Sequence, residues 1–300
     1  MKYSIVITTF NSASCIDRAL DGIEQLDHLP DETILVDDGS TDETISLIRK
    51  RLSGVLNIRI LQNSKNMGQS YSRNLGVCEA SNQFVIFMDD DDFSLPQRPI
   101  THLDSFADGA DFSFVSSRKI YQNGYAISAI NDDLYSSAET AVSLIRHLTT
   151  NTPLAGSKRI YSPSSTLAVR KEAFLKLNGF REDMRRLEDI EIACRALSSG
   201  LTLNWSSKIM VERTDTLGSD KNAEANFIGE IAVLDSVKEL LGRREYFVAK
   251  EMSIFRKIYF DRKWRAIFKK SLVIILIISL SPSKMKSVYN RLRHDIAQRF

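Results

Sequence analysis

The first half of the chain alternates short apolar runs with longer helix-like stretches, and this alternation constrains the fold more than any other feature. The apolar runs, bounded by polar residues, predict buried strands over Ser4–Thr9, Thr33–Val36, Ile58–Leu61 and Phe84–Met88. Helical patterns lie between them, over Ser14–Leu26, Asp42–Arg51 and Gln69–Ala80. Such alternation predicts an α/β fold, with a mostly parallel central sheet and helices on both faces.

Polar side chains gather directly after three of these predicted strands. Thr8-Thr9-Phe10-Asn11 follows the first, Asp37-Asp38-Gly39-Ser40 the second, and Asp89-Asp90-Asp91-Asp92 the fourth. In sheets of this class, ligands bind outside the carboxyl ends of the strands. The sequence therefore predicts a site at this edge, lined by several carboxylates, a pair of hydroxyls and an aromatic ring.

The start of the second helix carries a capping signal. Ser40-Thr41-Asp42-Glu43 has the spacing of a capping box. In that motif a Ser side chain and a Glu three residues later satisfy amides that the first helical turn leaves exposed. We therefore expect Ser40 and Glu43 to cap this helix.

The second half of the chain is less regular. Strands are predicted over Phe112–Ser116 and Ser165–Val169. Helices are predicted over Ser137–Thr149, Leu187–Ser199, Ala223–Leu241 and Arg244–Tyr259.

Four adjacent carboxylates, Asp89 to Asp92, form the strongest single feature of the sequence. Like charges raise one another's pKa unless a cation compensates them. A hard divalent ion with oxygen ligands, Mg²⁺ or Mn²⁺, is the natural compensator and would bridge to diphosphate oxygens. An isolated acidic run is more often a solvated loop, but the apolar strand before this one favours a metal site.

Five short motifs follow one another along the first two thirds of the chain. They are Thr8-Thr9-Phe10-Asn11, Val36-Asp37-Asp38-Gly39-Ser40-Thr41-Asp42, Asn66-Met67-Gly68 with Ser72-Arg73-Asn74-Leu75-Gly76, Met88-Asp89-Asp90-Asp91-Asp92, and Asn178-Gly179-Phe180 followed by Leu187-Glu188-Asp189 and Arg195. Each motif is short, but five in this order over residues 1–215 are hard to obtain by chance. The order resembles that of the family 2 glycosyltransferases of the GT-A fold. The resemblance implies the GT-A fold and transfer of a sugar from a nucleotide-sugar donor.

On the donor side, the resemblance implies roles for several residues. Thr8 and Phe10 would line the nucleobase pocket, with Phe10 packed against the base, and Asp38 would accept a hydrogen bond from the base. Arg73 is assigned to the substrate-binding residues, although a structural ion pair would explain Arg73 and Arg195 equally well. Phe10 has an alternative place in the core, and Asp38 an alternative role in ending a strand.

The resemblance also implies the metal ligands and the base. Asp89 and Asp91 match the outer members of the family's Asp-x-Asp: Asp89 would face the ribose and sugar of the donor, and Asp91 with Asp89 would hold the Mg²⁺ or Mn²⁺ ion. Asp189 matches the family's general base, which removes the proton of the acceptor hydroxyl as its oxygen attacks the anomeric carbon. Without the resemblance, Glu188-Asp189 would indicate only acids that suit the dipole of a first helical turn.

One departure from the family pattern concerns histidine. Many relatives place a histidine after the base helix as a further metal or diphosphate contact, whereas the four histidines here lie elsewhere. Arg213-Thr214-Asp215 occupies that stretch. Either Asp215 substitutes for the histidine or the contact is absent.

The resemblance predicts an inverting glycosyltransferase that moves a sugar from a UDP-sugar to a hydroxyl of a saccharide or lipid-linked saccharide acceptor in surface polysaccharide biosynthesis. A sugar-phosphate nucleotidyltransferase shares the fold, but its glycine-rich phosphate loop has no counterpart between Thr8 and Ser14. The same absence counts against a nicotinamide-dependent dehydrogenase. A catalytically inactive, membrane-attached binding partner would lack Asp91 or Asp189, and both are present.

The C-terminal part of the chain differs in charge from the rest. Residues 255–300 contain 12 Lys and Arg against two acidic residues, whereas residues 1–254 contain 28 basic and 36 acidic residues. The apolar run Leu272–Leu280 falls well short of the ~20 residues needed to span a bilayer. The flanking cations favour an anionic membrane surface, with a buried core helix or a solvated helical face as alternatives. No nucleic-acid recognition motif accompanies the charge, so no nucleic-acid partner is expected.

The sequence thus predicts a GT-A catalytic domain over residues 1–220 and a helical, basic extension over residues 221–300. Within the domain, residues 1–110 would bind the nucleotide-sugar and residues 111–220 the acceptor. The three cysteines lack disulfide or zinc spacing, which fits a reducing compartment. The apolar run after Lys2 is too short for a signal peptide. We therefore expect a cytoplasmic protein, peripheral on the inner face of the cell membrane.

Overall fold

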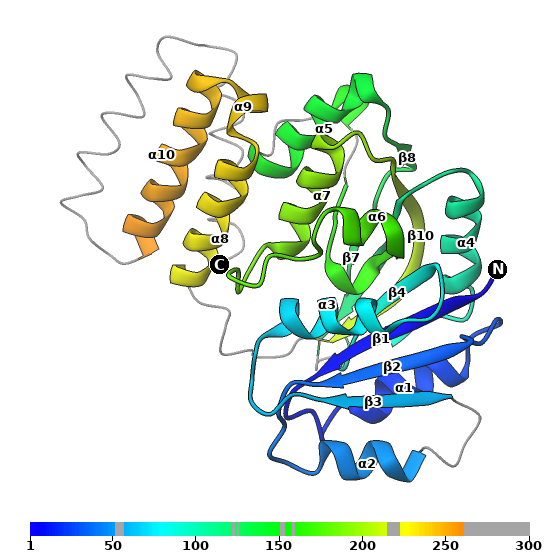
Figure 1. The fold of residues 1–300 in the computed structure, drawn as a ribbon. Helices are drawn as coiled ribbons and strands as arrows, with labels where there is room; N and C mark the ends of the chain where they lie inside the picture. Colours follow the sequence, from blue (N-terminus) through cyan, green and yellow to red (C-terminus); the bar gives the residue numbers. More distant parts are fainter. Residues whose placement is uncertain are drawn as a thin grey trace.

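The computed structural model describes residues 1–51, 57–121, 124, 126–150, 154–157, 160–214 and 223–260. Within them, ten strands form one sheet in the order β3-β2-β1-β4-β9-β6-β10-β5, with β7 beside β6 and β8 beside β10 (Figure 1). The strands are β1 (Tyr3–Thr9), β2 (Glu32–Asp37), β3 (Ile58–Gln62), β4 (Phe84–Asp89), β5 (Phe93–Ser94), β6 (Phe112–Ile120), β7 (Ala126–Ala129), β8 (Leu134–Tyr135), β9 (Leu167–Arg170) and β10 (Leu203–Thr214). The long ladders, including all those among β1 to β4, are parallel, and the shorter ones are antiparallel.

Helices cover both faces of this sheet, as the sequence predicts (Figure 1). They are α1 (Ile16–Glu24), α2 (Thr44–Arg51), α3 (Gln69–Glu79), α4 (Arg98–Ala107), α5 (Ala138–Thr150), α6 (Lys171–Lys176), α7 (Glu188–Ser198), α8 (Ala223–Ser236), α9 (Lys238–Leu241) and α10 (Arg243–Phe260). Successive side chains of a strand point to opposite faces. Val6 and Phe87 accordingly join a core cluster with α3, α6 and α7, whereas Ile7 and Met88 join a second cluster with α1, α2 and α4.

The four strands expected from apolar runs in the first half are all present, each within one residue of its predicted bounds. Their side chains are almost entirely buried in β1, β2 and β4, which lie in the middle of this half of the sheet. Strands buried on both faces read as continuous apolar runs, so their pattern could be recognised without any alternation.

Helix α3 lies unusually close to β1. A Cβ atom added at Gly76 would stand 2.4 Å from Cγ1 of Val6, closer than real atoms approach. The missing side chain at Gly76 therefore lets the helix rest directly on the strand, and α3 is held firmly in place at the centre of the fold.

Strand β10 is not predicted by the sequence. Polar residues interrupt its apolar run, and its register against β6 shifts between Trp205 and Ile209 and again before Val211. Such irregularities bend a strand and break its alternating pattern. The strand nevertheless continues to Thr214, and its end pairs with β5.

The capping box predicted at Ser40 and Glu43 is wrong. Helix α2 begins at Thr44, and its amide donates a hydrogen bond of 3.0 Å to Oδ1 of Asp42. A short acidic side chain reaches the exposed amide two residues later, so Asp42 caps the helix. The Ser40 hydroxyl instead accepts a hydrogen bond of 2.9 Å from the amide of Asn11 and joins two loops.

The C-terminal helices pack against the rest of the described chain. Side chains from α8, α9 and α10, among them Val233, Leu241 and Ala249, belong to the larger core cluster together with α7. The helix expected over residues 223–241 is divided at Val237 into α8 and α9. Among the described residues, no helix combines the length and the apolar character needed to cross a bilayer. The expected domain boundary near residue 220, Asp215 and the apolar run Leu272–Leu280 lie outside the described residues.

Candidate functional site

The polar residues that follow β1, β2 and β4 lie together at one edge of the sheet. In the parallel register, Thr8 stands opposite Val36 on one side and Asp89 on the other. The loops beyond these strands are joined: Asn11 Oδ1 accepts a hydrogen bond of 2.8 Å from the Thr41 amide. Asn11 itself has a φ of 52°, which turns the chain sharply after β1. One continuous surface therefore runs across the three strand ends.

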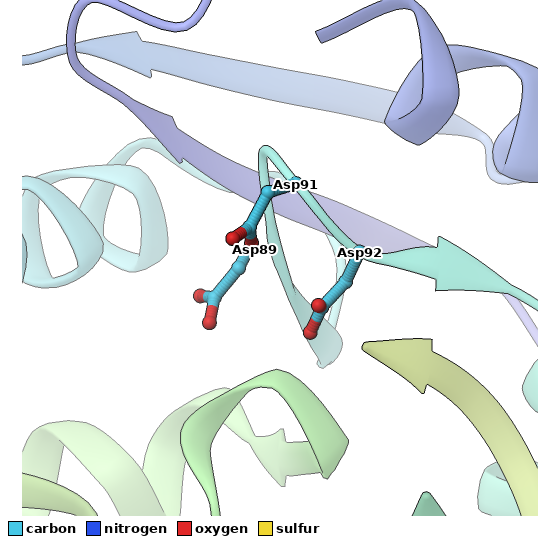
Figure 2. Close-up of side chains that lie close together, drawn as sticks. All are labelled: Asp89, Asp91 and Asp92. Carbon is cyan, nitrogen blue, oxygen red and sulfur yellow. The ribbon is translucent and has the colours of Figure 1, made fainter. Parts of the chain in front are cut away.

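Three carboxylates at the end of β4 converge. Asp89, Asp91 and Asp92 each offer an oxygen, and these oxygens all lie within 4.8 Å of one another (Figure 2). Asp90 belongs to a different contact: its carboxylate accepts hydrogen bonds from the Ser12 hydroxyl and, at 3.3 Å, from the Phe10 amide. The expectation from the sequence named Asp89 and Asp91 and missed Asp92, because the family pattern covers only the first three residues of the run.

Asp92 is the least solvated member of this acidic cluster. It is 2% exposed, and its Oδ2 accepts no hydrogen bond from the described residues. Burial, together with the charges of Asp89 and Asp91, raises the pKa of Asp92 to about 8. Crowded carboxylate oxygens with an unused buried acceptor fit a hard cation such as Mg²⁺ or Mn²⁺.

Two arginines lie close to the acidic cluster without having been expected there. Nε of Arg213, near the end of β10, is 3.7 Å from Oδ2 of Asp92, and the neighbouring Thr214 hydroxyl donates to the carbonyl of Asp91. Arg98 is fully buried and donates to the carbonyls of Phe87 and Ser165 at 2.6 and 2.7 Å. Burial lowers the pKa of Arg98 to about 10.

The position of Arg213 bears on the missing histidine. Asp215 lies outside the described residues, whereas Arg213 stands beside the cluster. Of the stretch Arg213-Thr214-Asp215, the path of β10 thus brings Arg213 and Thr214 to the acidic cluster.

Asp38 is held rigidly at the end of β2. Its Oδ1 accepts hydrogen bonds of 2.8 Å from the Asn63 side chain and the Met67 amide, and its Oδ2 accepts one of 2.8 Å from the Gly68 amide. The buried Asp38 carboxylate therefore shapes the loop that leads into α3. It does more than end the strand.

Thr8 and Phe10 differ in exposure although only one residue separates them. Thr8 is 9% exposed within β1, whereas the Phe10 side chain is 44% exposed just beyond it. Phe10 is therefore not part of the core, which was one of its two possible roles. It presents an open aromatic face at the edge where the aspartates lie.

Arg73 joins the two sides of the site. The guanidinium lies on α3, is 2% exposed, and donates to Oδ1 of Asp89 at 2.7 Å and to Oε1 of Glu188 at 3.0 Å. Burial and the adjacent Asp189 raise the pKa of Glu188 to about 7. The sequence left two roles open for Arg73, substrate binding and a structural ion pair. The structure identifies Asp89 and Glu188 as its ion-pair partners.

Asp189, the predicted base, stands in the first turn of α7 and remains partly open to solvent. Its Oδ1 accepts a hydrogen bond of 2.8 Å from the Ile190 amide. Burial raises the pKa of Asp189, while that amide and the guanidinium groups of Arg73, Arg213 and Arg186 oppose the rise. A carboxylate with a raised pKa is a stronger base than a solvated one.

The turn before α7 is fixed from two directions. Asn74 on α3 exchanges a pair of 2.8 Å hydrogen bonds with the carbonyl and amide of Phe180. Arg195 on α7 pairs with Glu191 at 2.7 Å and donates to the carbonyl of Gly179 at 2.8 Å. Arg195 therefore holds this turn in place. The sequence motifs that contain Asn74 and Phe180 contact each other directly.

Comparisons with known proteins agree with this arrangement. The sequence profile described as Glycosyl transferase family 2 matches residues 4–199. The O-antigen chain rhamnosyltransferase RfbN of Salmonella typhimurium is 27% identical over 219 residues, 71% of this chain and 67% of the relative. The GalNAc(5)-diNAcBac-PP-undecaprenol beta-1,3-glucosyltransferase of Campylobacter jejuni is 33% identical over 92 residues, 30% of this chain and 30% of the relative.

The likeness extends to solved structures. The poly(ribitol-phosphate) beta-N-acetylglucosaminyltransferase TarS of Staphylococcus aureus is 26% identical over 194 residues, 63% of this chain, and the match spans only 31% of TarS. The structure of S. aureus TarS residues 1–349 in complex with UDP-GlcNAc superposes with a TM-score of 0.64 at 20% identity, covering 87% of this chain and 73% of that one. At that identity the likeness shows the fold, which is the GT-A fold.

Proposed function

The chain belongs to glycosyl transferase family 2 and is a glycosyltransferase, and we propose that it transfers a sugar from a UDP-sugar to a hydroxyl of a saccharide or lipid-linked saccharide, with inversion at the anomeric carbon. One observation carries the proposal: ion pairs of Arg73 with Asp89 and Glu188 link the converging carboxylates Asp89, Asp91 and Asp92 to the first turn of the helix that carries Asp189. The buried Arg73 spans the two groups.

The donor would bind across the ends of β1, β2 and β4. Phe10 offers an exposed ring for stacking on the nucleobase, and Thr8 lies beside it at the strand end. Asp38, fixed by three donors, would accept a hydrogen bond from the base. Asp89 would face the ribose and the sugar, and Arg73 stands close enough to Asp89 to take part in donor binding. The UDP and UDP-GlcNAc complexes of TarS support a uridine nucleotide.

Asp91 and Asp89 would hold a Mg²⁺ or Mn²⁺ ion, and the geometry adds Asp92 to this set. The ion, when bound, would neutralise the diphosphate of the departing nucleotide. Arg213 would offer the diphosphate a further positive charge, in the place where relatives have a histidine. These assignments rest on the crowded carboxylate oxygens and on Oδ2 of Asp92, which accepts no hydrogen bond from the described residues.

Asp189 would act on the acceptor. Its carboxylate would accept the proton of the acceptor hydroxyl while that oxygen forms a bond to the anomeric carbon and the bond from this carbon to the diphosphate breaks. The attack comes from the face opposite the leaving group, so the anomeric configuration inverts. The nucleoside diphosphate leaves with the electron pair of the broken bond.

The acceptor class follows from the relatives. Their names describe an O-antigen chain, a poly(ribitol phosphate) and an undecaprenol-linked glycan. We infer a saccharide or lipid-linked saccharide acceptor in surface polysaccharide biosynthesis, with residues 1–110 binding the donor and residues 111–220 the acceptor.

The basic C-terminal extension would hold the protein on the inner face of the cell membrane. Residues 255–300 carry 12 Lys and Arg against two acidic residues, which suits anionic lipids. The intact chain should sediment with anionic liposomes in low salt, and a chain ending at Arg243 should not. Salt should weaken the attachment, because surface charges are screened within ~8 Å at physiological ionic strength. Failure of the intact chain to sediment would contradict membrane attachment.

Calorimetry with UDP-sugars tests the catalytic proposal. Wild type should bind a UDP-sugar more tightly with Mn²⁺ or Mg²⁺ than without, and Asp91→Asn should lose this dependence, since an amide cannot balance the ion. Asp90→Asn is the matched control, because Asp90 contacts Ser12 and Phe10 instead of the cluster. Metal-dependent affinity that survives Asp91→Asn would remove the metal assignment. A panel of nucleotide sugars in the same assay identifies the donor.

A further inference from the structure

Three charged side chains of the site, of which Arg73 and Glu188 are buried, form a chain. The Arg73 guanidinium has one nitrogen on Asp89 and another on Glu188, with both the arginine and Glu188 less than 5% exposed. Its two partners have different places in the site. Asp89 ends β4 on the metal-binding side, and Glu188 is the first residue of the helix that carries Asp189.

Glu188 is tied to α3 twice. Besides Arg73, Gln69 donates a hydrogen bond of 2.9 Å from its side chain to the same Glu188 oxygen. Helix α3 itself packs directly on β1 at Gly76. The start of α7 is therefore bound to a helix that lies against the central strands.

Asp189 has no comparable tether of its own. Among the described residues, the hydrogen bond found for its carboxylate comes from the amide of the next residue, Ile190. The preceding Leu187 has a left-handed φ of 65° and supplies no side-chain cap to the helix. The location of the Asp189 carboxylate is thus set by the first turn of α7, and that turn is held through Glu188.

We propose that Arg73 and Glu188 are positioning residues, which through their buried contact fix the distance between the catalytic base Asp189 and the donor end of β4. A buried ion pair stabilises a fold only weakly against an apolar replacement but fixes how two elements meet. The guanidinium of Arg73 contacts Asp89, on the proposed donor side, and Glu188, next to the proposed base. This inference rests on the proposed role of Asp189.

The proposal differs from a direct contact between Arg73 and the donor in what Glu188 should do. If Arg73 serves only the donor, losing Glu188 should leave catalysis intact. If the contact aims Asp189, losing Glu188 should slow transfer and leave donor binding unchanged. A misplacement of about 1 Å at a reacting group can cost roughly 10²-fold in rate.

The experiment uses Glu188→Ala in the full-length chain, with transfer rate and calorimetric donor affinity both measured. We expect kcat to fall by about 10²-fold, with donor affinity in Mn²⁺ within about twofold of wild type. Glu188→Gln, which still accepts from Gln69 and Arg73, should recover part of the rate and covers the case in which the alanine variant does not fold. Glu191→Ala is the matched control, because it removes a buried carboxylate paired with Arg195 from the same helix. It should lower the melting temperature without the loss of kcat.

A double variant separates this proposal from the function on which it rests. If Glu188 acts by placing Asp189, adding Glu188→Ala to Asp189→Asn should cause little further loss, because the base is already absent. Multiplied losses, an unchanged kcat in Glu188→Ala, or a parallel fall in donor affinity would each overturn the positioning role. Absence of transfer by wild type, or normal transfer by Asp189→Asn, would instead overturn the proposed function.

Discussion

The donor side and the base side of the site are built by different means. On the donor side, Asp38 and the aspartate run follow parallel strands directly, and backbone amides such as those of Met67 and Gly68 hold Asp38 in place. On the base side, Glu188 is held by Arg73, 115 residues earlier in the chain. Strand ends and backbone amides therefore hold Asp38 on the donor side, whereas a contact between distant side chains holds Glu188 on the base side.

This difference predicts how the two sides respond to substitution. A change on the donor side should appear as weaker binding of the nucleotide-sugar or the ion. A change on the base side should appear as slower transfer with binding retained, because its residues act on the acceptor proton. The experiments below test where this division holds.

The largest effect is expected for Asp189→Asn. Transfer should fall by about 10²–10⁴-fold, the usual contribution of a general base, while donor affinity stays near that of wild type. The melting temperature should change little, because Asn also suits a helix start. Asp183→Asn, an exposed acid paired with Arg181 before the same helix, should leave the rate unchanged. A rate for Asp189→Asn within a few-fold of wild type would remove Asp189 from the mechanism.

Arg213→Gln should weaken nucleotide binding although Arg213 does not follow any of the donor-side strands. Arg213 is on β10, away from the three donor strands, yet it faces Asp92 and should contact the diphosphate. We expect UDP affinity in Mn²⁺ to fall by about 10- to 100-fold, the value of a hydrogen bond to a charged group. Calorimetry measures this, with Arg118→Gln as control, since Arg118 pairs with Glu212 nearby. Equal affinities in wild type and Arg213→Gln would show that Arg213 serves Asp92 alone.

Asn74→Ala tests the contact between α3 and the turn at Phe180, which precedes the base helix. The substitution leaves the amide and the carbonyl of Phe180 without their partner, which should lower the free energy of unfolding by about 1–3 kcal/mol. Denaturant unfolding measures the loss. Asn57→Ala, which removes one exposed hydrogen bond to Asp31, should cost much less. Similar losses in both variants would mean that the turn at Phe180 is held by other contacts.

The smallest effect concerns pH. The pKa of Asp92, raised to about 8 in the fold, exceeds that of an unfolded aspartate, so its contribution to stability is full at low pH and is lost as pH rises through 8. The metal-free protein should therefore lose roughly a few degrees of melting temperature between pH 5 and 8. Mn²⁺ should restore more stability at pH 8 than at pH 6. Asp92→Asn should make the profile shallower but not flat, because the raised pKa of Glu188 contributes with the same sign. A stability that rises over this interval in the metal-free protein would contradict the assignment.

The same difference explains what could be predicted from the sequence. Strands β1 to β4 and the aspartates after them are visible because a buried parallel strand is a continuous apolar run and its end is polar. The motifs also named Asp189. Nothing local marks Arg98. The motifs include Glu188 and Arg213, but not their contacts with Arg73 and Asp92, because these partners come from distant parts of the chain. The capping prediction at Ser40 failed because the helix begins later, at Thr44, whose amide donates to Asp42.

The left-handed backbone conformation of Leu187 bears on how the protein could evolve higher stability. A leucine held at a φ of 65° immediately before α7 costs roughly 1–2 kcal/mol relative to a relaxed residue. Selection for heat resistance alone should therefore favour Gly or Asn at position 187, which accept this conformation readily. Leu187 also packs against the larger core cluster, so the replacement would loosen the turn that aims Asp189. Thermostable descendants of this enzyme should be slower unless a second change restores that packing, the usual trade-off between stability and activity.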